Sequence, residues 1–379
     1  MERAELMALL RATGYAEERG GFVFLRDPHW TETDRAQVAT LQSSIENRES
    51  KIPSGWLCVR TGGSGGGVKF ARHDERTLSA AVQGFVTHFG LTRVNTVDVL
   101  PAHHVSGLMA RVRSAATGGE HVAWQWKKLE TGEMPALSDA AGGWVISLVP
   151  TQLQRLLAQP PAVAWLRRFK IVFLGGGPTW PALADAAAAS ELRVSLSYGM
   201  TETAAMVTAL RPEEFLSGAR SCGAPLPHAR VSLDNDGVVR IAGESVFRGY
   251  FPEGSETREF ATEDLGHFDE RGHLHILGRR DAVIISGGKK IHAAEVEAQL
   301  RASGEFIDVA VVGVPDREWG ESVVACYLVT SHLPDLTRAT AKLAPHERPK
   351  RFVAVTDWPR NAVGKVNRAE LAKRFAAAK

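Results

Sequence analysis

The most informative part of this 379-residue chain is residues 170–203, which read KIVFLGGGPTWPALADAAAASELRVSLSYGMTET. An apolar run at 170–174 leads into three glycines and a proline, and an alanine-rich segment at 182–189 precedes a second apolar run at 193–197. A strand, a helix and a strand in this order predict a βαβ unit with parallel strands. Parallel sheets bind ligands at the carboxyl ends of their strands, so the residues that follow these two runs are candidates for a site.

The same alternation extends upstream of this stretch. Apolar runs at 97–100 and 144–149 predict further strands, and helical patterns cover 74–89 and 152–157. Residues 1–50 are polar with helical spacing of their apolar side chains, which predicts helices. We therefore expect an α/β fold whose large N-terminal domain, residues 1–280, contains mainly parallel sheets flanked by helices.

The pattern changes near residue 222. Short apolar segments at 230–233, 238–242 and 273–277 are separated by Asn-Asp-Gly and Glu-Arg-Gly, which predict tight turns in a small antiparallel β region. Residues 281–379 have the size and the mixed patterns of a separate, small and mobile α+β domain. Its predicted strands lie at 306–314 and 322–330, and its predicted helices at 292–301, 336–343 and 367–377.

Composition excludes several classes of protein. Hydrophobic residues make up 44% of the chain and charged residues 23%, as in globular proteins with a sizeable core. The 45 basic and 43 acidic side chains leave a net charge of only +2, which argues against nucleic acid as the main partner. Three scattered cysteines argue against a secreted protein and favour the cytoplasm. No apolar run reaches the roughly 18 residues of a membrane helix.

The first candidate site is a glycine-rich loop that ends in a lysine, TGGSGGGVK. The backbone N–H groups of glycines can turn toward an anion, so the loop is suited to phosphates. It is not the P-loop of nucleoside triphosphatases, because Val68 separates the last glycine from Lys69 and Phe70 replaces the hydroxyl that binds Mg²⁺. A flexible linker is the alternative. The loop consists of Thr61, Gly62, Gly63, Ser64, Gly65, Gly66, Gly67, Val68 and Lys69.

Two further candidate loops follow the strands of the quoted stretch. Gly175, Gly176 and Gly177 would let a flat ligand lie against the backbone, or would simply form a tight turn. The second loop offers an aromatic face, hydroxyls and one carboxylate, Glu202, that suits Mg²⁺. The alternative for Glu202 is a helix-start residue favoured by the helix dipole. This second loop comprises Tyr198, Gly199, Met200, Thr201, Glu202 and Thr203.

Two weaker patterns lie downstream. Asp264 and Arg279 suit the hydroxyls of a ribose, although a turn aspartate and a surface ion pair would explain them too. Lys365, next to Gly364, is equally typical of a solvated surface. An exposed hairpin explains three nearby histidines better than a metal site does, because no cysteine or carboxylate set completes a ligand shell. These histidines are His267, His273 and His275.

Together and in this order, these patterns resemble the adenylate-forming superfamily of acyl-CoA synthetases, non-ribosomal adenylation domains and luciferases. Two stretches, LPAHHVSGL at 100–108 and SLVPTQLQRLL at 147–157, are more similar to one branch, the o-succinylbenzoate–CoA ligases of menaquinone biosynthesis. SCGAPLP at 221–227 and ISGG at 285–288 agree with that branch. The resemblance implies an AMP-forming acid–CoA ligase that uses ATP, Mg²⁺ and coenzyme A and works through an acyl-adenylate.

The resemblance also implies a role for each matching residue in nucleotide binding. The glycine-rich loop would hold the β- and γ-phosphates of ATP. Thr201 would contact the α-phosphate, and Glu202 would hold Mg²⁺. The residues around adenine and ribose would be Gly175, Gly176, Gly177, Tyr198, Gly199, Met200, Asp264 and Arg279.

The remaining roles that the resemblance implies concern the acyl group and coenzyme A. His104 would close the acyl pocket beside the reacting carboxylate. Lys365 would bridge that carboxylate and the α-phosphate, and Asp281 would be the hinge between the two domains. The acyl pocket would also include Ser106 and Gly107, and the coenzyme A tunnel would include Ser286, Gly287 and Gly288.

The chain departs from the superfamily pattern at several positions. Gly62 and Gly65 replace hydroxyl residues, Val68 replaces a proline, Ala282 replaces an aspartate, and His103 replaces an aromatic residue. Fewer residues than usual precede the phosphate loop, so part of the N-terminal subdomain is expected to be missing. The surface exposed in this way would pair in a homodimer, or the missing layer is dispensable. The alternative functions are a CoA ligase for another aromatic or medium-chain acid and a non-catalytic nucleotide-binding relative.

Overall fold

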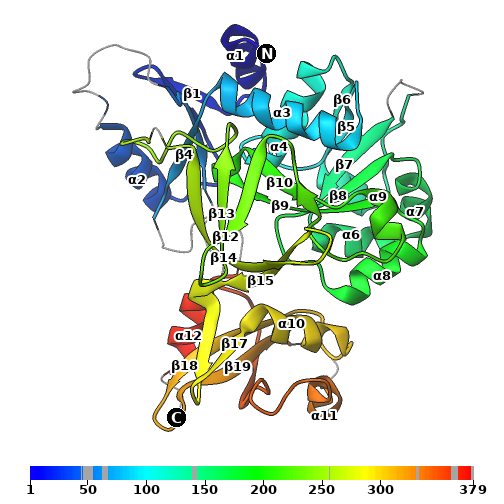
Figure 1. The fold of residues 1–379 in the computed structure, drawn as a ribbon, viewed down its shortest axis with the longest axis vertical. Coiled ribbons are helices and arrows are strands. Elements are labelled where there is room, and N and C mark those ends of the chain that lie inside the picture. Colours follow the sequence, from blue (N-terminus) through cyan, green and yellow to red (C-terminus); the bar gives the residue numbers. More distant parts are fainter. Residues whose placement is uncertain are drawn as a thin grey trace.

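The structure is a computed structural model that describes residues 1–43, 45, 54–61, 67–138, 143–255, 257–329, 333–359 and 366–376. The strands of these residues form four sheets, three in the upper body of Figure 1 and one in the lower body. Every helix in these ranges is too short or too polar to cross a lipid bilayer.

The central sheet has seven strands in the order β11-β10-β9-β8-β7-β5-β6. Neighbours from β6 to β9 are parallel, whereas β10 and β11 are antiparallel, so the expected mainly parallel sheet is confirmed. Its strands are β5 (Asn95–Asp98), β6 (His121–Ala123), β7 (Trp144–Leu148), β8 (Ile171–Leu174), β9 (Val194–Met200), β10 (Ala205–Ala209) and β11 (Ala224–Pro225). The helices that connect them are α4 (Val105–Ala116), α5 (Trp126–Glu130), α6 (Pro150–Leu157), α7 (Pro160–Leu166), α8 (Pro181–Ala189) and α9 (Pro212–Leu216).

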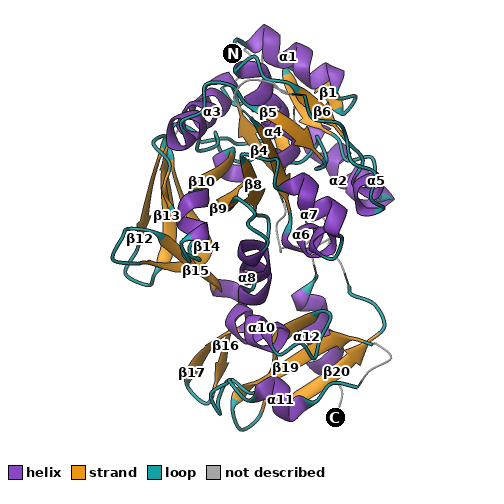
Figure 2. Ribbon diagram, turned by 90° about the vertical axis from the view of Figure 1, so that its right-hand side faces the viewer, coloured by secondary structure: helices purple, strands orange, loops and turns teal. Residues whose placement is uncertain are grey.

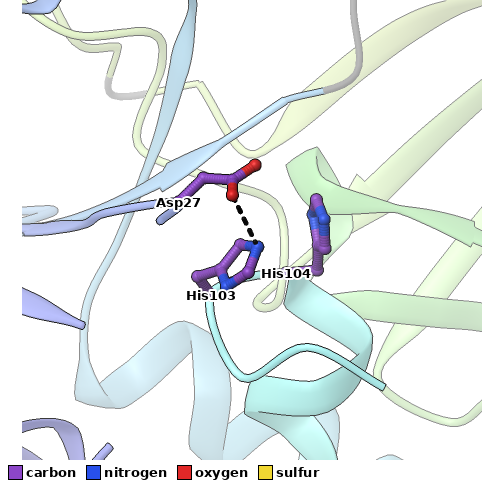
Figure 3. Close-up of side chains that lie close together, drawn as sticks. All are labelled: Asp27, His103 and His104. Atoms are coloured by element: carbon purple, nitrogen blue, oxygen red, sulfur yellow. Dashed lines mark ion pairs between the residues drawn. The ribbon is translucent and has the colours of Figure 1, made fainter. Parts of the chain in front are cut away.

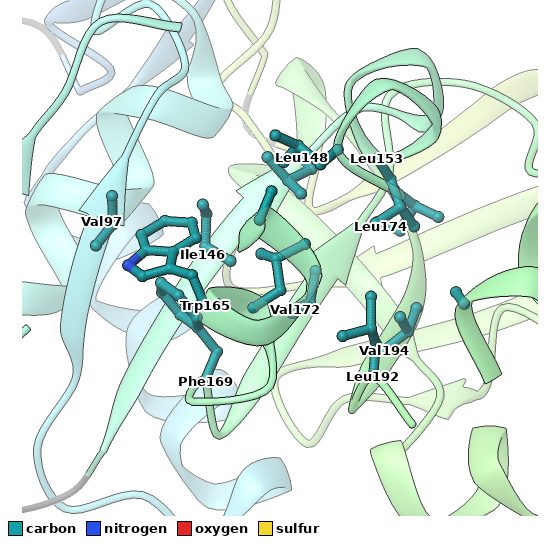
Figure 4. Packing of buried hydrophobic residues seen from close by; sticks show 14 of the residues in the cluster. Val97, Ile146, Leu148, Leu153, Trp165, Phe169, Val172, Leu174, Leu192 and Val194 are labelled. Carbon is teal, nitrogen blue, oxygen red and sulfur yellow. The ribbon is translucent and has the colours of Figure 1, made fainter. Parts of the chain in front are cut away.

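Burial on both faces explains why these strands are continuous apolar runs. On one face, Val97, Ile146, Val172 and Val194 pack in one cluster with Trp165 of α7 (Figure 4). Alternate residues of the same strands point to the other face and pack against α3 (Glu75–Phe89). The residues of that second cluster include Phe85, Val145, Ile171 and Phe173.

The N-terminal residues form strands as well as helices, so the expectation of helices alone is wrong. β2 (Phe22–Leu25) lies between β1 (Ala16–Arg19) and β3 (Leu57–Arg60), antiparallel to the first and parallel to the second. All four side chains of β2 are buried, because its two faces belong to two different core clusters. The same region contains α1 (Arg3–Ala12), α2 (Glu32–Ser43) and β4 (Phe70–His73), and β4 completes this sheet.

The predicted antiparallel region is confirmed as a four-stranded sheet in the order β12-β13-β14-β15. The strand that was not predicted, β14, carries two glutamates and a histidine at exposed positions and few large apolar residues at the others, which hides its alternation. The strands are β12 (Ala229–Leu233), β13 (Val238–Gly243), β14 (Glu259–Phe268) and β15 (Leu274–Arg279).

The lower body begins after a short 3-10 turn, Arg280–Ala282. Its strands follow the order β17-β16-β19-β18, and β20 lies parallel to β19. Helix α10 lies between this sheet and the upper body, against α8 and β15 (Figure 2). The elements are β16 (Val283–Ser286), β17 (Lys289–His292), α10 (Ala293–Ala302), β18 (Val309–Asp316), β19 (Gly320–Leu328), α11 (Leu336–Thr340), β20 (Arg351–Val355) and α12 (Arg368–Ala376).

Candidate active site

The loop after β8 lies beside β9, because β9 is longer than predicted and continues to Met200. The predicted loop residues Tyr198, Gly199 and Met200 are therefore strand residues, and only Thr201, Glu202 and Thr203 follow the strand. Leu174 at the end of β8 is in register with Leu196, so Gly175 lies level with Ser197 of β9. A side chain at Gly175 would approach the Ser197 hydroxyl at 3.1 Å. Gly176 has a φ of +76°, in the region that favours glycine, and together with exposed Gly177 it leaves an open edge beside β9.

Tyr198 of β9 is joined to the antiparallel sheet. Its hydroxyl donates a hydrogen bond of 2.7 Å to the carboxylate of Asp264 on β14. Burial and this carboxylate raise the pKa of Tyr198, so the hydroxyl keeps its proton and remains a donor. The pair brings two predicted nucleotide-binding residues, 66 positions apart in the chain, into contact.

Gly199 has a structural reason to be glycine. A Cβ at this position would lie 2.0 Å from the backbone oxygen of Ala205 on β10, which no side chain can tolerate. The neighbouring Met200 is half-buried and packs toward the cluster under the antiparallel sheet. The packing of β9 against β10 is therefore enough to require glycine at this position.

The residues that follow form a strained turn. Thr201–Thr203 is a single 3-10 turn, and Ala204 and Ala205 after it have φ values of +52° and +80°. Residues other than glycine rarely adopt this conformation, and each instance costs about 1–3 kcal/mol. Thr203 closes the turn, because its hydroxyl bonds to the Met200 nitrogen at 3.1 Å and to the Ala205 oxygen at 2.7 Å.

His73 of β4 holds this turn from the N-terminal sheet. Its Nε2 donates a hydrogen bond of 2.7 Å to the backbone oxygen of Thr201, and the imidazole is fully buried. Burial lowers the pKa of His73 to about 4, so the ring is neutral at physiological pH. His73 could not be identified from the sequence, because no local pattern indicates a contact between residues 128 positions apart.

Glu202 lies in a cluster with a tyrosine and a lysine. Its carboxylate accepts a hydrogen bond of 2.8 Å from the Tyr250 hydroxyl, and the ammonium of Lys69 lies 5.6 Å from the Tyr250 ring centre. Glu202 is only 9% exposed, and burial raises its pKa. A buried carboxylate supplies the oxygen ligands that Mg²⁺ prefers, so this residue fits a magnesium ligand. Sequence analysis did not identify Tyr250.

The ends of the glycine-rich loop lie beside this cluster. The Thr61 nitrogen donates to the Lys69 oxygen at 2.9 Å, so the loop connects β3 and β4 as part of a hairpin. Gly62, Gly63, Ser64, Gly65 and Gly66 lie outside the described residues, and so does Lys365.

Arg279 pairs with a neighbour in the chain. It makes two hydrogen bonds of 2.8 Å to the carboxylate of Asp281, and both side chains are nearly half exposed. Arg279 also lies opposite Asp264 in the register of β14 and β15. The predicted ribose residues are therefore cross-strand neighbours, and one of them contacts the predicted hinge.

The predicted acyl-pocket residues lie at the start of α4. His104 immediately precedes this helix, Ser106 is half-buried in its first turn, and Gly107 is buried. A Cβ at Gly107 would lie 2.3 Å from the Pro101 oxygen, so close packing requires this glycine. Leu108 of α4 packs in the same core cluster as Ala204, which places the start of this helix near the Thr201 turn.

Within the described ranges, the one group of three histidine, cysteine or acidic side chains whose ligand atoms lie within 4.8 Å of one another is Asp27, His103 and His104 (Figure 3). Asp27 was not identified from the sequence. Of the three hairpin histidines, His267 and His275 stack with ring centres 4.8 Å apart. His273 contacts Ser221 and Glu214 instead. His267 and His275 are cross-strand neighbours in the hairpin of β14 and β15, as expected, whereas His273 is buried and not exposed.

Ser286, Gly287 and Gly288 form the turn between β16 and β17. Both glycines have positive φ values, +56° and +75°, and the Gly287 nitrogen donates to the Trp319 oxygen at 2.8 Å. A Cβ at Gly287 would lie 2.7 Å from the Trp319 ring. Turn geometry and the contact with Trp319 therefore explain these glycines. The turn belongs to the sheet of the lower body, whereas the Thr201 turn belongs to the central sheet.

The comparisons with known proteins agree with this arrangement. Residues 53–251 match the AMP-binding enzymes, and residues 295–365 match the AMP-binding enzyme C-terminal domain. The chain is 30% identical over 349 residues to a 2-succinylbenzoate–CoA ligase of Enterococcus faecalis, covering 86% of this chain and 71% of the relative. It is 30% identical over 397 aligned residues to that of Bacillus licheniformis, covering 98% of this chain and 80% of the relative.

A solved structure of a related protein has a similar fold. The o-succinylbenzoate coenzyme A synthetase of Bacillus subtilis, in complex with ATP and a magnesium ion, has a TM-score of 0.72 and 25% identity. The similarity covers 87% of this chain and 74% of that one. The matches cover between 59% and 80% of the curated relatives' own length. By sequence and by fold, this chain belongs to the family of AMP-binding enzymes.

Proposed function

We propose that this chain is a 2-succinylbenzoate–CoA ligase that consumes ATP and works through an acyl-adenylate. Relatives that carry this name support the substrate. The observation that carries the chemistry is the cluster of Glu202, Tyr250 and Lys69 beside the Thr201 turn. A buried carboxylate, an adjacent cation and a strained turn are features of a site that is organised before its ligand binds.

In this proposal the ligand ATP lies along the carboxyl edge of β8 and β9. Adenine lies between the Gly175 loop and Tyr198, and the ribose hydroxyls donate to Asp264, whose carboxylate already accepts the Tyr198 hydroxyl. Thr201 contacts the α-phosphate. Glu202 holds Mg²⁺, which would supply charge neutralisation for the phosphates. The loop from Thr61 to Lys69 surrounds the terminal phosphates.

The first half-reaction needs positioning more than proton transfer. A carboxylic acid is ionised far above its pKa of about 4, so it is already the nucleophile. Its oxygen attacks the α-phosphorus, the bond to the β-phosphate oxygen breaks, and pyrophosphate leaves. The lysine that we assign to bringing the two anions together is Lys365. In the second half-reaction the thiol of coenzyme A attacks the acyl carbon, and AMP and a proton leave.

We also propose a division into residues 1–280 and 281–379 with a hinge at Asp281. The 3-10 turn at Arg280–Ala282 lies between the antiparallel sheet and the sheet of the lower body, which supports this division. Rotation would separate Asp281 from Arg279. An exposed ion pair is worth about 1 kcal/mol or less, so this contact would not prevent the movement. A cytoplasmic location and a homodimer remain predictions.

The test is pyrophosphate release from ATP and Mg²⁺ with 2-succinylbenzoate and a panel of other aromatic and fatty acids. We expect release with 2-succinylbenzoate, and a CoA thioester only when coenzyme A is added. Pyrophosphate release with another acid but not with 2-succinylbenzoate would show that the other acid is the substrate. No pyrophosphate release with any acid, while ATP still raises the melting temperature, would indicate a non-catalytic relative.

A matched pair of lysine variants tests the assignment of Lys365. Lys365→Ala should abolish adenylation, with thiolation of supplied acyl-adenylate largely retained. Lys373→Ala, which removes an exposed lysine of α12, should leave both steps unchanged. Equal loss of both half-reactions in Lys365→Ala would contradict the assigned role.

A further inference from the structure

We propose that Asp27 is a positioning residue for the acyl end of the site, and that it acts on His104 through His103. The inference rests on the proposed function and on the place beside the reacting carboxylate that the family resemblance implies for His104. Asp27 lies in the N-terminal segment, residues 1–52, which precedes the matched family region at 53–251. The N-terminal segment would then help to shape the acyl pocket, in addition to packing in the hydrophobic core with β3 and β4.

The geometry around His103 carries the argument. Its Nε2 lies 3.4 Å from Oδ1 of Asp27, and Figure 3 shows these two groups pointing toward each other. The Tyr15 ring meets His103 edge-on with ring centres 5.1 Å apart, and the His104 ring lies 4.6 Å away. His103 is only 5% exposed. Two residues of the N-terminal segment and one acyl-pocket residue thus contact one buried imidazole.

The contact with Asp27 selects one tautomer of His103. A carboxylate accepts only, so it favours the form whose proton is on Nε2. Burial, together with nearby His104, lowers the pKa of His103 to about 4, so the ring is neutral. Its Nδ1 is then an unprotonated nitrogen, buried and without a hydrogen-bond partner in the described part of the chain. Asp27 is therefore the polar group that defines the orientation of this ring.

Asp27 is itself held firmly. Its Oδ1 accepts from the His29 nitrogen at 2.9 Å, and its backbone oxygen accepts from the Trp30 nitrogen at 3.2 Å. It follows β2 by two residues, and β2 is paired with β3 at Val23 and Phe24. The carboxylate is 7% exposed, so solvent does not compete strongly for it. A fixed acceptor of this kind can define the orientation of an adjacent imidazole and of the tilted His104 ring in contact with it.

The experiment compares variants in the full-length protein. Asp27→Ala should lower kcat/KM for 2-succinylbenzoate by about 10- to 100-fold, as expected for a misplaced reacting group, while the rise in melting temperature with ATP and Mg²⁺ stays unchanged. Asp27→Asn, which keeps an oxygen acceptor, should retain most of the activity. His29→Ala is the matched control, because it removes the exposed side chain on the same carboxylate. It should behave like the wild type.

A double-mutant cycle separates positioning from a structural role of the turn. In the His103→Phe background, Asp27→Ala should cause no further loss of kcat/KM, because its effect passes through the imidazole. An equal loss in both backgrounds would show that Asp27 acts by another route, and would overturn the inference.

A substrate-free measurement distinguishes failure of this inference from failure of the proposed function. Long-range ¹⁵N–¹H spectra of ¹⁵N-histidine-labelled protein, with His103 assigned from the His103→Phe variant, report its tautomer. We expect the Nε2–H form in the wild type and its loss in Asp27→Ala. An unchanged His103 tautomer would overturn the role of Asp27 even if the ligase reaction is observed. A wild type that is inactive with every acid would refute the proposed function alone.

Discussion

The support that His73 gives to the Thr201 turn can be tested directly. The imidazole is fully buried and donates to the Thr201 oxygen at 2.7 Å, while Ala204 and Ala205 after the turn have positive φ values. Such a turn keeps its shape only while its neighbours hold it. We predict that His73→Leu, which roughly preserves the volume but removes the donor, lets the turn relax and displaces Glu202.

The magnitude follows from the lost hydrogen bond. A buried carbonyl without a partner costs about 1–3 kcal/mol, so the free energy of unfolding should fall by about 2 kcal/mol. A displacement of about 1 Å at Thr201 and Glu202 should lower the rate of adenylation by about 10²-fold. His73→Gln, whose amide nitrogen can replace Nε2 as donor, should recover most of both losses.

Chemical denaturation and ATP–pyrophosphate exchange measure these two effects. The Leu and Gln variants are compared at position 73 under identical conditions, with the wild type as reference. If both variants lose the same stability and the same exchange activity, the hydrogen bond is not what supports the turn. An unchanged exchange rate in His73→Leu would refute the reasoning.

Three further predictions concern buried charge. Burial raises the pKa of Glu202, so burying its ionised carboxylate destabilises the folded protein. Glu202→Gln should therefore raise the melting temperature of the ligand-free protein by a few degrees and abolish the further rise with Mg²⁺ and ATP. A retained rise would exclude Glu202 as the magnesium ligand. Asp74 caps the N-terminus of α3 and forms a buried ion pair of 3.1 Å with Arg248, so Asp74→Ala should cost about 3–5 kcal/mol in denaturation experiments. Adding Arg248→Met should restore part of this loss, and no restoration would show that the helix cap dominates. Burial lowers the pKa values of His73 and His228 to about 4. Between pH 6.5 and 4 these histidines are therefore protonated in the unfolded chain but remain neutral in the folded protein. Unfolding free energy should therefore fall between pH 6.5 and 4, by up to about 3 kcal/mol for each histidine, and a flat profile would contradict their burial in the neutral form.

Four of the seven strands of the central sheet, β5, β7, β8 and β9, could be predicted from the sequence to within a few residues, whereas β6, β10 and β11 were not predicted. The predicted runs at 144–149 and 170–174 correspond to β7 (Trp144–Leu148) and β8 (Ile171–Leu174). They are recognisable because strands covered by helices on both faces must be apolar at every position. The glycine loops and the Thr201 turn were found for a related reason, since they follow these strands directly.

The strands that escaped prediction have weaker signals. β2 has only four residues, too few for periodicity to distinguish a strand from part of a helix. β14 is recognisable as a strand only by its pairing with β13 and β15, because most of its side chains are polar or partly exposed. In both cases the neighbours in space, and not the segment itself, make the strand stable.

The sequence alone was sufficient for the fold class, for the family and for the loops that hold most candidate ligands of ATP, because these depend on local patterns of apolar residues and glycines. The partners of those residues depend on folding. Glu202 meets Tyr250, Thr201 meets His73, and His103 meets Asp27. Each contact joins segments far apart in the chain, and no local pattern encodes it. Packing of one sheet against another brings these groups together, and their burial then determines their charge and their hydrogen bonds.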